Sequence, residues 1–328
     1  MDPGSFHTVI AGRRSSRPLR ERTRVLAAAG KSSGLGSRRV LAVGDASLAP
    51  PPSGKATEPV LPVRRGRLAH PLPMHTLLRV LLRRAGARSL LARLTGARVA
   101  MVLDPHLSAA ERSEFVELGQ EVAPATALPV DAAFAAAKGL GLDVSGNRAH
   151  MILDVGAGKT YAAILSWGGI VSLSWAEFGG QDLDAALQRF IEERHHIRIS
   201  LDEAEALKVA VGSVFPRKAH GAYPLGGRDE RTGFEKKVLL DDNDLRDVLA
   251  DACEPLFSTV QNCLTGMPPE LSGDIEAGGV TLVGGGALIY GLPDFLAERL
   301  GLRFLLAPDP LNTTIRGAQA LLRAARAN

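Results

Sequence analysis

The chain has 328 residues, of which 45% are hydrophobic and 23% are charged, with a formal net charge of +4 at pH 7. This length and apolar content suffice for a large core and favour two lobes over one small domain. No apolar run approaches the roughly 20 residues that span a bilayer. We therefore expect a cytoplasmic protein that is soluble or attached peripherally to a membrane.

Charge is divided unevenly along the chain. Residues 1–100 hold 19 Lys and Arg against 4 Asp and Glu, a net of +15, whereas residues 101–328 have a net charge of −11. Opposite charges would favour head-to-tail association of copies. The alternatives are a basic face that meets anionic lipid, and a merely solvated N-terminal arm. No aromatic residues interleave with the arginines at 13, 14, 17, 20, 22 and 24, so no specific nucleic-acid partner is predicted.

The first 130 residues show short strands and two helices. A strand over 39–43 is followed by a Pro-rich connection over 49–62. The stretch 76–94 predicts a helix, with Leu77, Leu78, Leu81 and Leu82 on one side, which favours a core-facing stripe over a membrane-surface helix. A buried strand follows over 99–103. A helix over 108–119 is expected to begin with a capping box between Ser108 and Glu111.

The two cysteines are predicted to lie on one helix. Cys253 and Cys263 are ten residues apart. On a single helix their Cα atoms would be roughly 15 Å apart, too far for a disulfide. A reducing compartment is the natural inference.

The segment 151–170 carries the strongest local signal. Met151 to Leu153 and Tyr161 to Leu165 are apolar runs that predict two strands, with a glycine-rich break between them. Glycines at such a turn let backbone N–H groups approach a phosphate, and the carboxylate of Asp154 can hold a hydrated divalent metal. The pattern predicts a phosphate-binding hairpin, although a glycine hairpin without a ligand is an alternative.

A P-loop is a further alternative, because Gly158 is followed by Lys159 and Thr160. That motif requires a glycine five positions before Gly158, where this chain has Leu153, and it requires a helix immediately afterwards. Neither requirement is met by the sequence, so the hairpin is favoured.

A second glycine-rich strand end lies about 130 residues further on. An apolar strand over 280–283 leads into Gly284, Gly285 and Gly286, and Ala287 then begins what reads as a helix. Consecutive glycines between a strand and a helix let a flat ligand lie on the backbone near a helix N-terminus. Together the two glycine-rich ends predict a nucleotide held between two lobes.

From residue 151 to residue 322 the chain resembles the MreB/Mbl-type bacterial actin homologues of the actin, DnaK and hexokinase superfamily. Asp154-Val-Gly-Ala-Gly-Lys-Thr160 is similar to the second phosphate loop of that family, and Gly284-Gly-Gly286 is similar to its adenosine loop. The segment 166–171 resembles the next strand, 179–184 the turn before a helix, and 204–216 the helix that touches base and ribose. Further matches lie at 228–233, 268–271, 307–311 and Gly317.

The resemblance implies an α/β, two-lobed actin-like (ribonuclease H-like) ATPase fold with a nucleotide cleft between the lobes. The first lobe would span 1–149, with a reduced small subdomain about 44–62, and the second 150–311, with a small subdomain about 183–244. Residues 312–328 would form a helix that returns to the first lobe. The contacts to ATP or ADP, with Mg²⁺ held through water by Asp154, would come from Asp154, Gly156, Ala157, Gly158, Lys159, Thr160, Glu205, Lys208, Gly284, Gly285, Gly286 and Ala287.

Two departures from the family bear on catalysis. The counterpart of the first phosphate loop is placed at Gly12, Arg13, Ser15 and Ser16, which puts Ile10 where the family has a metal-holding Asp. The Glu that positions the attacking water falls on Ala132, with Asp131 beside it but turned roughly 100° away on a helix. Of the three acids that the family uses, this places only Asp154.

The sequence therefore predicts a cell-shape protein that binds adenine nucleotide with weak or absent hydrolysis. Lys159, where the family usually has Thr, could reach a phosphate and partly replace the charge of the metal, or it could be a solvated charge at the hairpin tip. Expected partners are the chain itself or a related bacterial actin, the cell-wall synthesis machinery, and an anionic membrane. An active ATPase or kinase-like enzyme, and a scaffold that binds no nucleotide, are the alternatives.

Overall fold

The structure, a computed structural model, describes residues 1–12, 17–29, 40–49, 56–86, 98–123, 126–218 and 221–325. The chain divides into two compact units, Met1–Asp143 together with the chain from Asn312, and Val144–Leu311. The second unit thus begins at Val144. The Trp167 N–H donates a 2.7 Å hydrogen bond to the Gly146 carbonyl, and the Gly168 N–H donates a 2.7 Å hydrogen bond to the Val144 carbonyl. These two bonds join residues 144–146 to the second unit.

A five-stranded sheet forms the centre of the second unit. It contains β11 (His150–Val155), β12 (Thr160–Ser166), β13 (Gly169–Ala176), β16 (Val280–Val283) and β17 (Phe304–Leu306) in the order β13-β12-β11-β16-β17. The first three strands form an antiparallel meander, and β11, β16 and β17 run parallel. All seven residues of β12 are buried, as expected of a strand with an apolar run covered on both faces.

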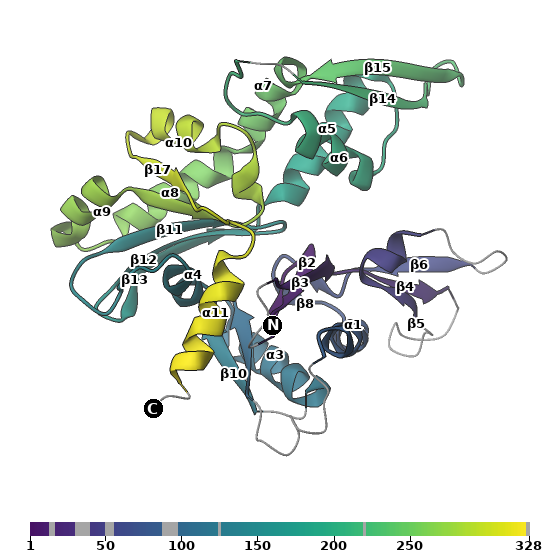
Figure 1. The fold of residues 1–328 in the computed structure, drawn as a ribbon. Helices are drawn as coiled ribbons and strands as arrows, with labels where there is room; N and C mark the ends of the chain where they lie inside the picture. Colours follow the sequence, from purple (N-terminus) through teal and green to yellow (C-terminus); the bar gives the residue numbers. More distant parts are fainter. Residues whose placement is uncertain are drawn as a thin grey trace. The chain divides into compact units, whose positions relative to one another are not determined.

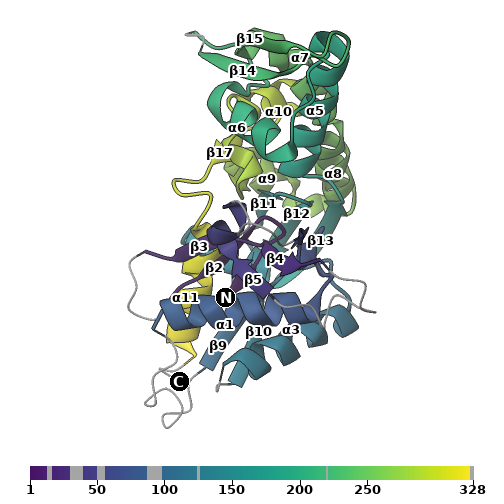
Figure 2. The ribbon, with the colours of Figure 1, turned by 90° about the vertical axis from the view of Figure 1, so that its right-hand side faces the viewer.

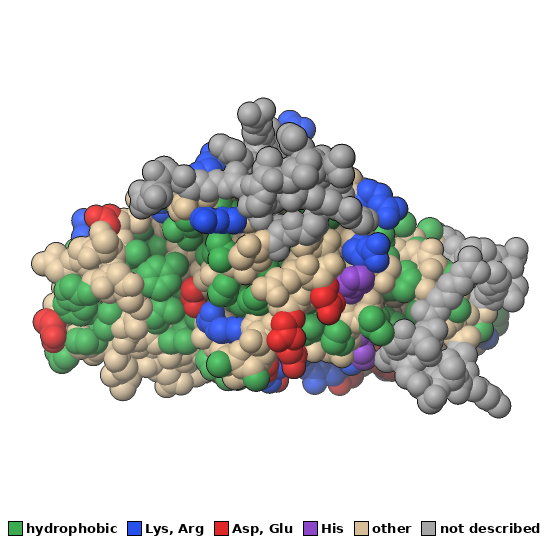
Figure 3. All heavy atoms as spheres, turned by 90° about the horizontal axis from the view of Figure 1, so that it is seen from below, with side chains coloured by type: hydrophobic (Ala, Val, Ile, Leu, Met, Phe, Trp, Pro, Cys, Tyr) green, Lys and Arg blue, Asp and Glu red, His purple; other side chains and the backbone are tan. Residues whose placement is uncertain are grey.

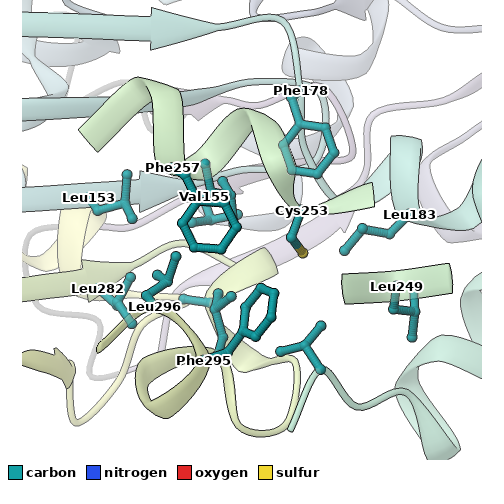
Figure 4. Packing of buried hydrophobic residues seen from close by; sticks show 14 of the residues in the cluster. Leu153, Val155, Phe178, Leu183, Leu249, Cys253, Phe257, Leu282, Phe295 and Leu296 are labelled. Carbon is teal, nitrogen blue, oxygen red and sulfur yellow. The ribbon is translucent and has the colours of Figure 1, made fainter. Parts of the chain in front are cut away.

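Helices α7 (Asp242–Ala252), α8 (Glu254–Thr265) and α10 (Leu292–Leu300) supply most of the helical part of the core in this unit. Figure 4 shows Leu153, Val155 and Leu282 of the sheet with Phe257 of α8 and Phe295 of α10. The centroids of the two phenyl rings are 5.3 Å apart. The contacts between sheet and helices therefore form one continuous apolar core.

The expected single helix through both cysteines is wrong. Cys253 caps the end of α7, and α8 begins at the next residue with Pro255 in its first turn. Proline cannot continue a helix but is favourable at a helix start, so the chain breaks here. Both cysteines are free and buried, and burial raises the pKa of the thiols to about 12 for Cys253 and about 11 for Cys263.

The rest of the second unit contains α5 (Gly180–His195), α6 (Leu201–Val211), the hairpin β14 (Ala222–Arg228) and β15 (Glu235–Asp241), and α9 (Ser272–Gly278). The family-like segment 228–233 forms the turn of a hairpin, since β14 and β15 pair antiparallel on either side of it. Helix α6 begins with a capping box between Ser200 and Glu203, and α7 with one between Asp241 and Asp244.

The first unit repeats the strand order of the second. β1 (Asp2–Pro3), β2 (His7–Ile10) and β3 (Leu19–Arg22) form an antiparallel sheet, and β9 (Arg98–Leu103) pairs parallel with β10 (Thr126–Asp131). A 2.8 Å hydrogen bond from the Val102 N–H to the Met1 carbonyl places β9 beside the start of β1. The order β3-β2-β1-β9-β10 therefore corresponds to β13-β12-β11-β16-β17.

Helices α1 (Pro71–Arg84) and α3 (Ala109–Val122) pack together in this unit (Figure 2). The leucines at 77, 78, 81 and 82 are at most 3% exposed, so the core-facing interpretation of this stripe is confirmed. The helix begins at Pro71, five residues before the predicted start, because proline is well suited to a first turn. The capping box between Ser108 and Glu111 is also confirmed.

Part of the Pro-rich connection forms a strand. Of its described residues, Thr57–Val60 form strand β6, which pairs with β4 (Val25–Ala28) beside β5 (Val40–Val43) in a three-stranded sheet. Proline is tolerated in an edge strand, and β6 lies at the edge of this sheet, which explains how Pro59 is accommodated. Short strands β7 (Val63–Arg64) and β8 (Arg67–Leu68) follow.

The C-terminal helix α11 (Thr313–Ala324) packs on α4 (Ala132–Gly139) within the first unit (Figure 1). The two backbones approach closely at glycines. A Cβ atom on Gly317 would lie 1.7 Å from the Ala135 carbonyl oxygen, and one on Gly139 would lie 2.1 Å from the Thr313 carbonyl oxygen. Only glycine at these positions permits this crossing.

The described surface carries charges of both signs. Figure 3 shows basic and acidic side chains interspersed with apolar ones on the face that it presents. On α1, Arg79, Arg83 and Arg84 are exposed. Among the described residues, none of the helices combines the length and the apolar character needed to cross a bilayer.

Candidate functional site

Asp154 lies at the end of a strand that turns back on itself. β11 and β12 pair antiparallel, with Asp154 opposite Tyr161. The turn between them closes with a 2.9 Å hydrogen bond from the Gly156 N–H to the Lys159 carbonyl. The predicted strand, glycine turn and strand are confirmed. The P-loop alternative is wrong, because the turn leads into strand β12 and not into a helix.

The first residues of helix α5 donate hydrogen bonds to the backbone carbonyls of this turn. The Gly180 N–H donates to the Gly156 carbonyl at 3.0 Å, and the Gln181 N–H donates to the Ala157 carbonyl at 2.7 Å. A Cβ atom on Gly179 would lie 2.6 Å from the Gly156 oxygen, so glycine is needed for this approach. The first backbone N–H groups of a helix, which have no partner within it, thus fix the turn.

The Thr160 side chain points into the second unit. Its hydroxyl is buried and donates a 2.9 Å hydrogen bond to the Phe178 carbonyl. This contact anchors strand β12 to the segment that precedes α5. Of the residues predicted to face phosphate, Thr160 is therefore used as a structural anchor in this structure.

The glycine-rich loop after β16 lies beside the hairpin. β11 and β16 pair parallel with Asp154 opposite Val283, so both strand ends reach the same edge of the sheet. Gly284 has φ +86°, and a Cβ atom there would lie 2.5 Å from the Val155 carbonyl oxygen and would also overlap a carboxylate oxygen of Asp154. The two glycine-rich strand ends that the sequence singled out therefore lie side by side within this unit.

The segment after the glycines is not the helix expected. Residues Gly286–Leu288 form a single 3₁₀ turn with Ala287 buried, and α10 begins only at Leu292. A Cβ atom on Gly285 would meet only the Leu311 side chain, at 3.3 Å. The loop therefore presents backbone, with little side-chain cover at Gly285.

Lys208 of α6 is held against the start of α5. Its ammonium group lies 2.6 Å from an Asp184 carboxylate oxygen and donates a 2.8 Å hydrogen bond to the Gly180 carbonyl. The Lys208 side chain is 16% exposed and that of Asp184 is 6% exposed. Glu205 lies one helical turn earlier and is partly exposed. Lys208 is thus joined to α5, which in turn holds the hairpin.

The first unit contains a second hairpin of the same form. Asp2 on β1 lies opposite Val9 on β2, at the same spacing along the chain as Asp154 and Tyr161. The turn again closes with a hydrogen bond, 3.1 Å long, from the Gly4 N–H to the His7 carbonyl. A Cβ atom on Gly4 would lie 2.8 Å from this carbonyl oxygen, against 2.9 Å for the corresponding pair at Gly156.

The sequence prediction missed this hairpin, although a signal for it exists. Asp2-Pro-Gly-Ser-Phe-His-Thr8 and Asp154-Val-Gly-Ala-Gly-Lys-Thr160 share Asp, Gly and Thr at identical spacing. A search for an internal repeat of this pattern would have found both. Asp2 and Gly4 are therefore additional candidate residues.

The residues that were predicted for the first phosphate loop fall elsewhere. Ile10 is buried in β2, opposite Leu19 of β3, in the second strand of the hairpin. The Gly12 carbonyl accepts a 2.6 Å hydrogen bond from the Gln319 side chain of α11. Arg13, Ser15 and Ser16 lie outside the described residues. Gly12 therefore serves as a docking point for the C-terminal helix.

The sequence analysis placed Asp131 on a helix, and this is wrong. It ends β10 and caps α4, where its side chain accepts a 2.9 Å hydrogen bond from the Ala133 N–H. Its other carboxylate oxygen lies 3.0 Å from the Arg112 guanidinium. Ala132 is the first residue of α4 and is buried. The Asp131 carboxylate is thus committed to a helix cap and an ion pair.

His7 occupies the position in the first hairpin that Lys159 occupies in the second. Because the pKa of His7 is lowered in the folded protein, the free energy of unfolding should decrease as the pH drops below about 6.5. Burial, and less strongly Arg20 and Arg22, lower the pKa of His7 from 6.5 to about 4, with Asp45 opposing this. Between these values the unfolded chain binds a proton that the folded chain excludes, so the free energy of unfolding decreases. A shift of this size corresponds to at most about 3 kcal/mol, reduced by solvent around the partly exposed ring.

Thermal melts of the wild type and of His7→Gln at neutral pH and at about pH 5 check this expectation. The variant should lose less stability than the wild type between the two conditions. Equal losses would contradict the lowered pKa of His7.

Solved structures of other proteins share this fold. A crystal structure of MreB5 of Spiroplasma citri bound to ADP matches with a TM-score of 0.89 at 24% identity, over 99% of this chain and 95% of that chain. A MamK double helical filament matches with a TM-score of 0.79 at 21% identity, over 98% and 97%. The chain therefore has the actin-like α/β fold that the sequence predicted.

Sequence relatives point to the same group. The chain is 31% identical over 187 residues to the cell shape-determining protein Mbl of Bacillus subtilis, which is 57% of this chain and 56% of that protein. It is 31% identical over 207 residues to the cell shape-determining protein MreB of Escherichia coli, and this alignment covers 63% of this chain and 60% of that protein. These alignments thus span little more than half of each relative. The family model described as MreB/Mbl protein matches residues 21–328, and the chain belongs to the MreB/Mbl family.

Proposed function

We propose that this chain is an adenine-nucleotide-binding bacterial actin of the cell-shape type. The observation that carries the proposal is the hairpin around Gly156, held by α5 and placed beside the glycine loop 284–286. A glycine turn next to a backbone-only loop suits a ligand with a phosphate end and a flat end. A family relative, MreB5 of Spiroplasma citri, has been crystallised with ADP and with AMPPNP, which supports the choice of ligand.

The residues of the second unit divide into three groups in this proposal. Asp154 and the turn residues Gly156, Ala157, Gly158 and Lys159 form the phosphate end, and Thr160 anchors the turn through its hydroxyl. Gly284, Gly285, Gly286 and Ala287 form the platform for the adenine ring. Glu205 and Lys208 lie towards the ribose and base, and Mg²⁺ accompanying the nucleotide would approach Asp154 through water.

The first phosphate-binding hairpin, in our proposal, is Asp2 to Ser5 and not the segment 12–16. Its geometry repeats that of the Asp154 hairpin, whereas Gly12 contacts α11. Asp2 is then the acid of the first hairpin, at the end of its first strand, where the sequence alignment had instead placed Ile10. The chain therefore departs less from the family than the sequence prediction implied.

Hydrolysis is proposed to be weak or absent. Phosphoanhydride hydrolysis requires a positioned water as well as neutralised charge. Ala132 offers no side chain for that task, and Asp131 is occupied by the Ala133 N–H and by Arg112. An active ATPase or kinase-like enzyme of the same fold is the alternative, and phosphate release from ATP distinguishes the two.

The proposed partners are copies of this chain or of a related bacterial actin. A MamK filament with the same fold supports self-association. Contact with cell-wall synthesis machinery and with an anionic membrane remains part of the proposal, as does a cytoplasmic or membrane-associated location. The exposed arginines 79, 83 and 84 of α1 are a basic surface for such a membrane.

Blocking the glycine loop should abolish nucleotide binding without unfolding the protein. At Gly285 the backbone has ordinary helical angles, and the only near neighbour of a new Cβ atom is the end of the Leu311 side chain, which can move. Gly285→Leu should therefore fold but weaken ATP binding by at least about tenfold in calorimetry, because the new side chain covers the platform.

Gly273→Leu is the matched control, since nothing lies within 4 Å of a Cβ atom there and the position is distant in sequence from every proposed contact. It should bind ATP as the wild type does. If the wild type binds no ATP, the proposed function is wrong and the chain is a structural scaffold that binds no nucleotide. If Gly285→Leu binds as tightly as the wild type with an unchanged melting temperature, the proposed platform is wrong.

A further inference from the structure

We propose that Lys208 is a positioning residue for the phosphate end of the nucleotide, which acts through the start of α5 and not by contact with the ribose or base. This rests on the proposed nucleotide binding. The Lys208 ammonium lies 2.6 Å from an Asp184 carboxylate oxygen and donates a 2.8 Å hydrogen bond to the Gly180 carbonyl. Both partners belong to α5, so the ammonium group is used to join the two helices.

The peptide unit between Gly180 and Gln181 links Lys208 to the turn of the Asp154 hairpin. The carbonyl of this unit accepts the hydrogen bond from the Lys208 ammonium. The N–H of the same unit, which belongs to Gln181, donates a 2.7 Å hydrogen bond to the Ala157 carbonyl. A charged donor makes a hydrogen bond stronger, and hydrogen bonds in a chain polarise one another. The lysine therefore reinforces the bond that holds the turn.

The lysine, the helix start and the turn are closely packed. A Cβ atom on Gly180 would lie 3.2 Å from the Lys208 Nζ atom and 3.8 Å from the Ala157 Cα atom. The N-terminal end of a helix carries a partial positive charge, which disfavours a cation there. The buried Asp184 carboxylate offsets this cost. The position of the ammonium group is thus set by specific partners and not by the general field of α5.

The bonds from α5 also set the direction in which the turn presents its N–H groups. The Gly156 and Ala157 carbonyls accept hydrogen bonds from the first N–H groups of α5 and therefore face that helix. In a planar trans peptide the N–H points opposite to the carbonyl, so the Ala157 N–H is directed away from α5. Backbone N–H groups oriented in this way at a turn attract anions. Loosening the start of α5 should therefore weaken the binding of phosphate.

Helix α6 also carries a residue of the adenosine end. Glu205 lies three residues before Lys208, which places the two side chains on one side of the helix. In the proposed function Glu205 lies towards the ribose. One helix then meets the adenosine end of the ligand through Glu205 and orients the phosphate end through Lys208. The loss of Lys208 should consequently weaken the binding of ATP much more than the binding of adenosine.

The test measures ATP affinity by calorimetry and adenosine affinity by displacement of ATP. The variant combines Lys208→Met with Asp184→Leu, because removing both charges leaves neither of them buried without its partner. It should bind ATP at least about tenfold more weakly than the wild type, while its adenosine affinity changes by less than about threefold. In the protein without nucleotide, hydrogen exchange at the Gln181 amide should be at least about tenfold faster.

Lys237→Met is the matched control, since Lys237 is an exposed lysine on β15, and it should change neither affinity. Equal losses of ATP and adenosine affinity in the double variant would mean that Lys208 contacts the ribose or base. That result would overturn the role in positioning and leave the proposed function intact, as would an unchanged ATP affinity. A wild type that binds no ATP would overturn both.

Discussion

Replacing Gly317 by alanine should destabilise the first unit by about 3 kcal/mol or more, because the new methyl group has no space. Its Cβ atom would lie 1.7 Å from the Ala135 carbonyl oxygen and 2.7 Å from the Gly139 nitrogen. Both neighbours are backbone atoms of α4, so no side-chain rotation relieves the overlap. Helix α11 would have to move away from α4, which exposes Ile315 and Ala318 of the unit core.

Thermal or urea denaturation of the purified variant measures this effect. Gly146→Ala is the control, because nothing lies within 4 Å of a Cβ atom at Gly146, and it should change stability by no more than about 0.5 kcal/mol. A Gly317→Ala protein as stable as the wild type would mean that α11 does not pack on α4 as the structure has it.

Replacing Lys208 by methionine should cost about 3 kcal/mol, since it leaves the Asp184 carboxylate buried without its cation. The two groups are 2.6 Å apart, and Asp184 is 6% exposed. Lys208 also donates to the Gly180 carbonyl, so the variant loosens α6 from the start of α5. The double variant Lys208→Met with Asp184→Leu should recover most of the loss, because no buried charge remains.

An exposed ion pair provides the comparison. Arg198 and Glu230 lie 2.7 Å apart with side chains 73% and 37% exposed, and Arg198→Met should change stability by less than about 1 kcal/mol. The measurement is again the denaturation midpoint of each variant. A single Lys208→Met variant that melts with the wild type would show that the buried pair does not contribute.

Local patterns predicted the Asp154 hairpin and its glycine loop correctly. Two apolar runs separated by glycines most simply form a β-hairpin, as β11 and β12 do. Strand β16 also ends in glycines, and because it pairs parallel with β11, its glycine-rich end lies next to the hairpin turn. The capping box at Ser108 and the leucine stripe of α1 were also predictable, because each depends on residues within one or three turns of a helix.

The second hairpin escaped prediction because β1 has only two residues, too few for any periodic signal. Its position depends on β9, about 100 residues away in the chain, which pairs with the segment through Met1. Asp131 was misplaced for a related reason, since the exact start of α4 depends on how β10 ends and on the pairing with Arg112.

The sequence by itself determined the family, the actin-like fold and the strand–glycine turn–strand hairpin at Asp154, because these depend on short motifs in a particular order. Only the tertiary structure decided what individual polar groups do. It placed Lys159 over Tyr161, joined Lys208 to Asp184, and turned Asp131 into a helix cap. A charged side chain can face solvent, a ligand or a buried partner with the same sequence pattern, and the choice depends on groups that are distant in the chain.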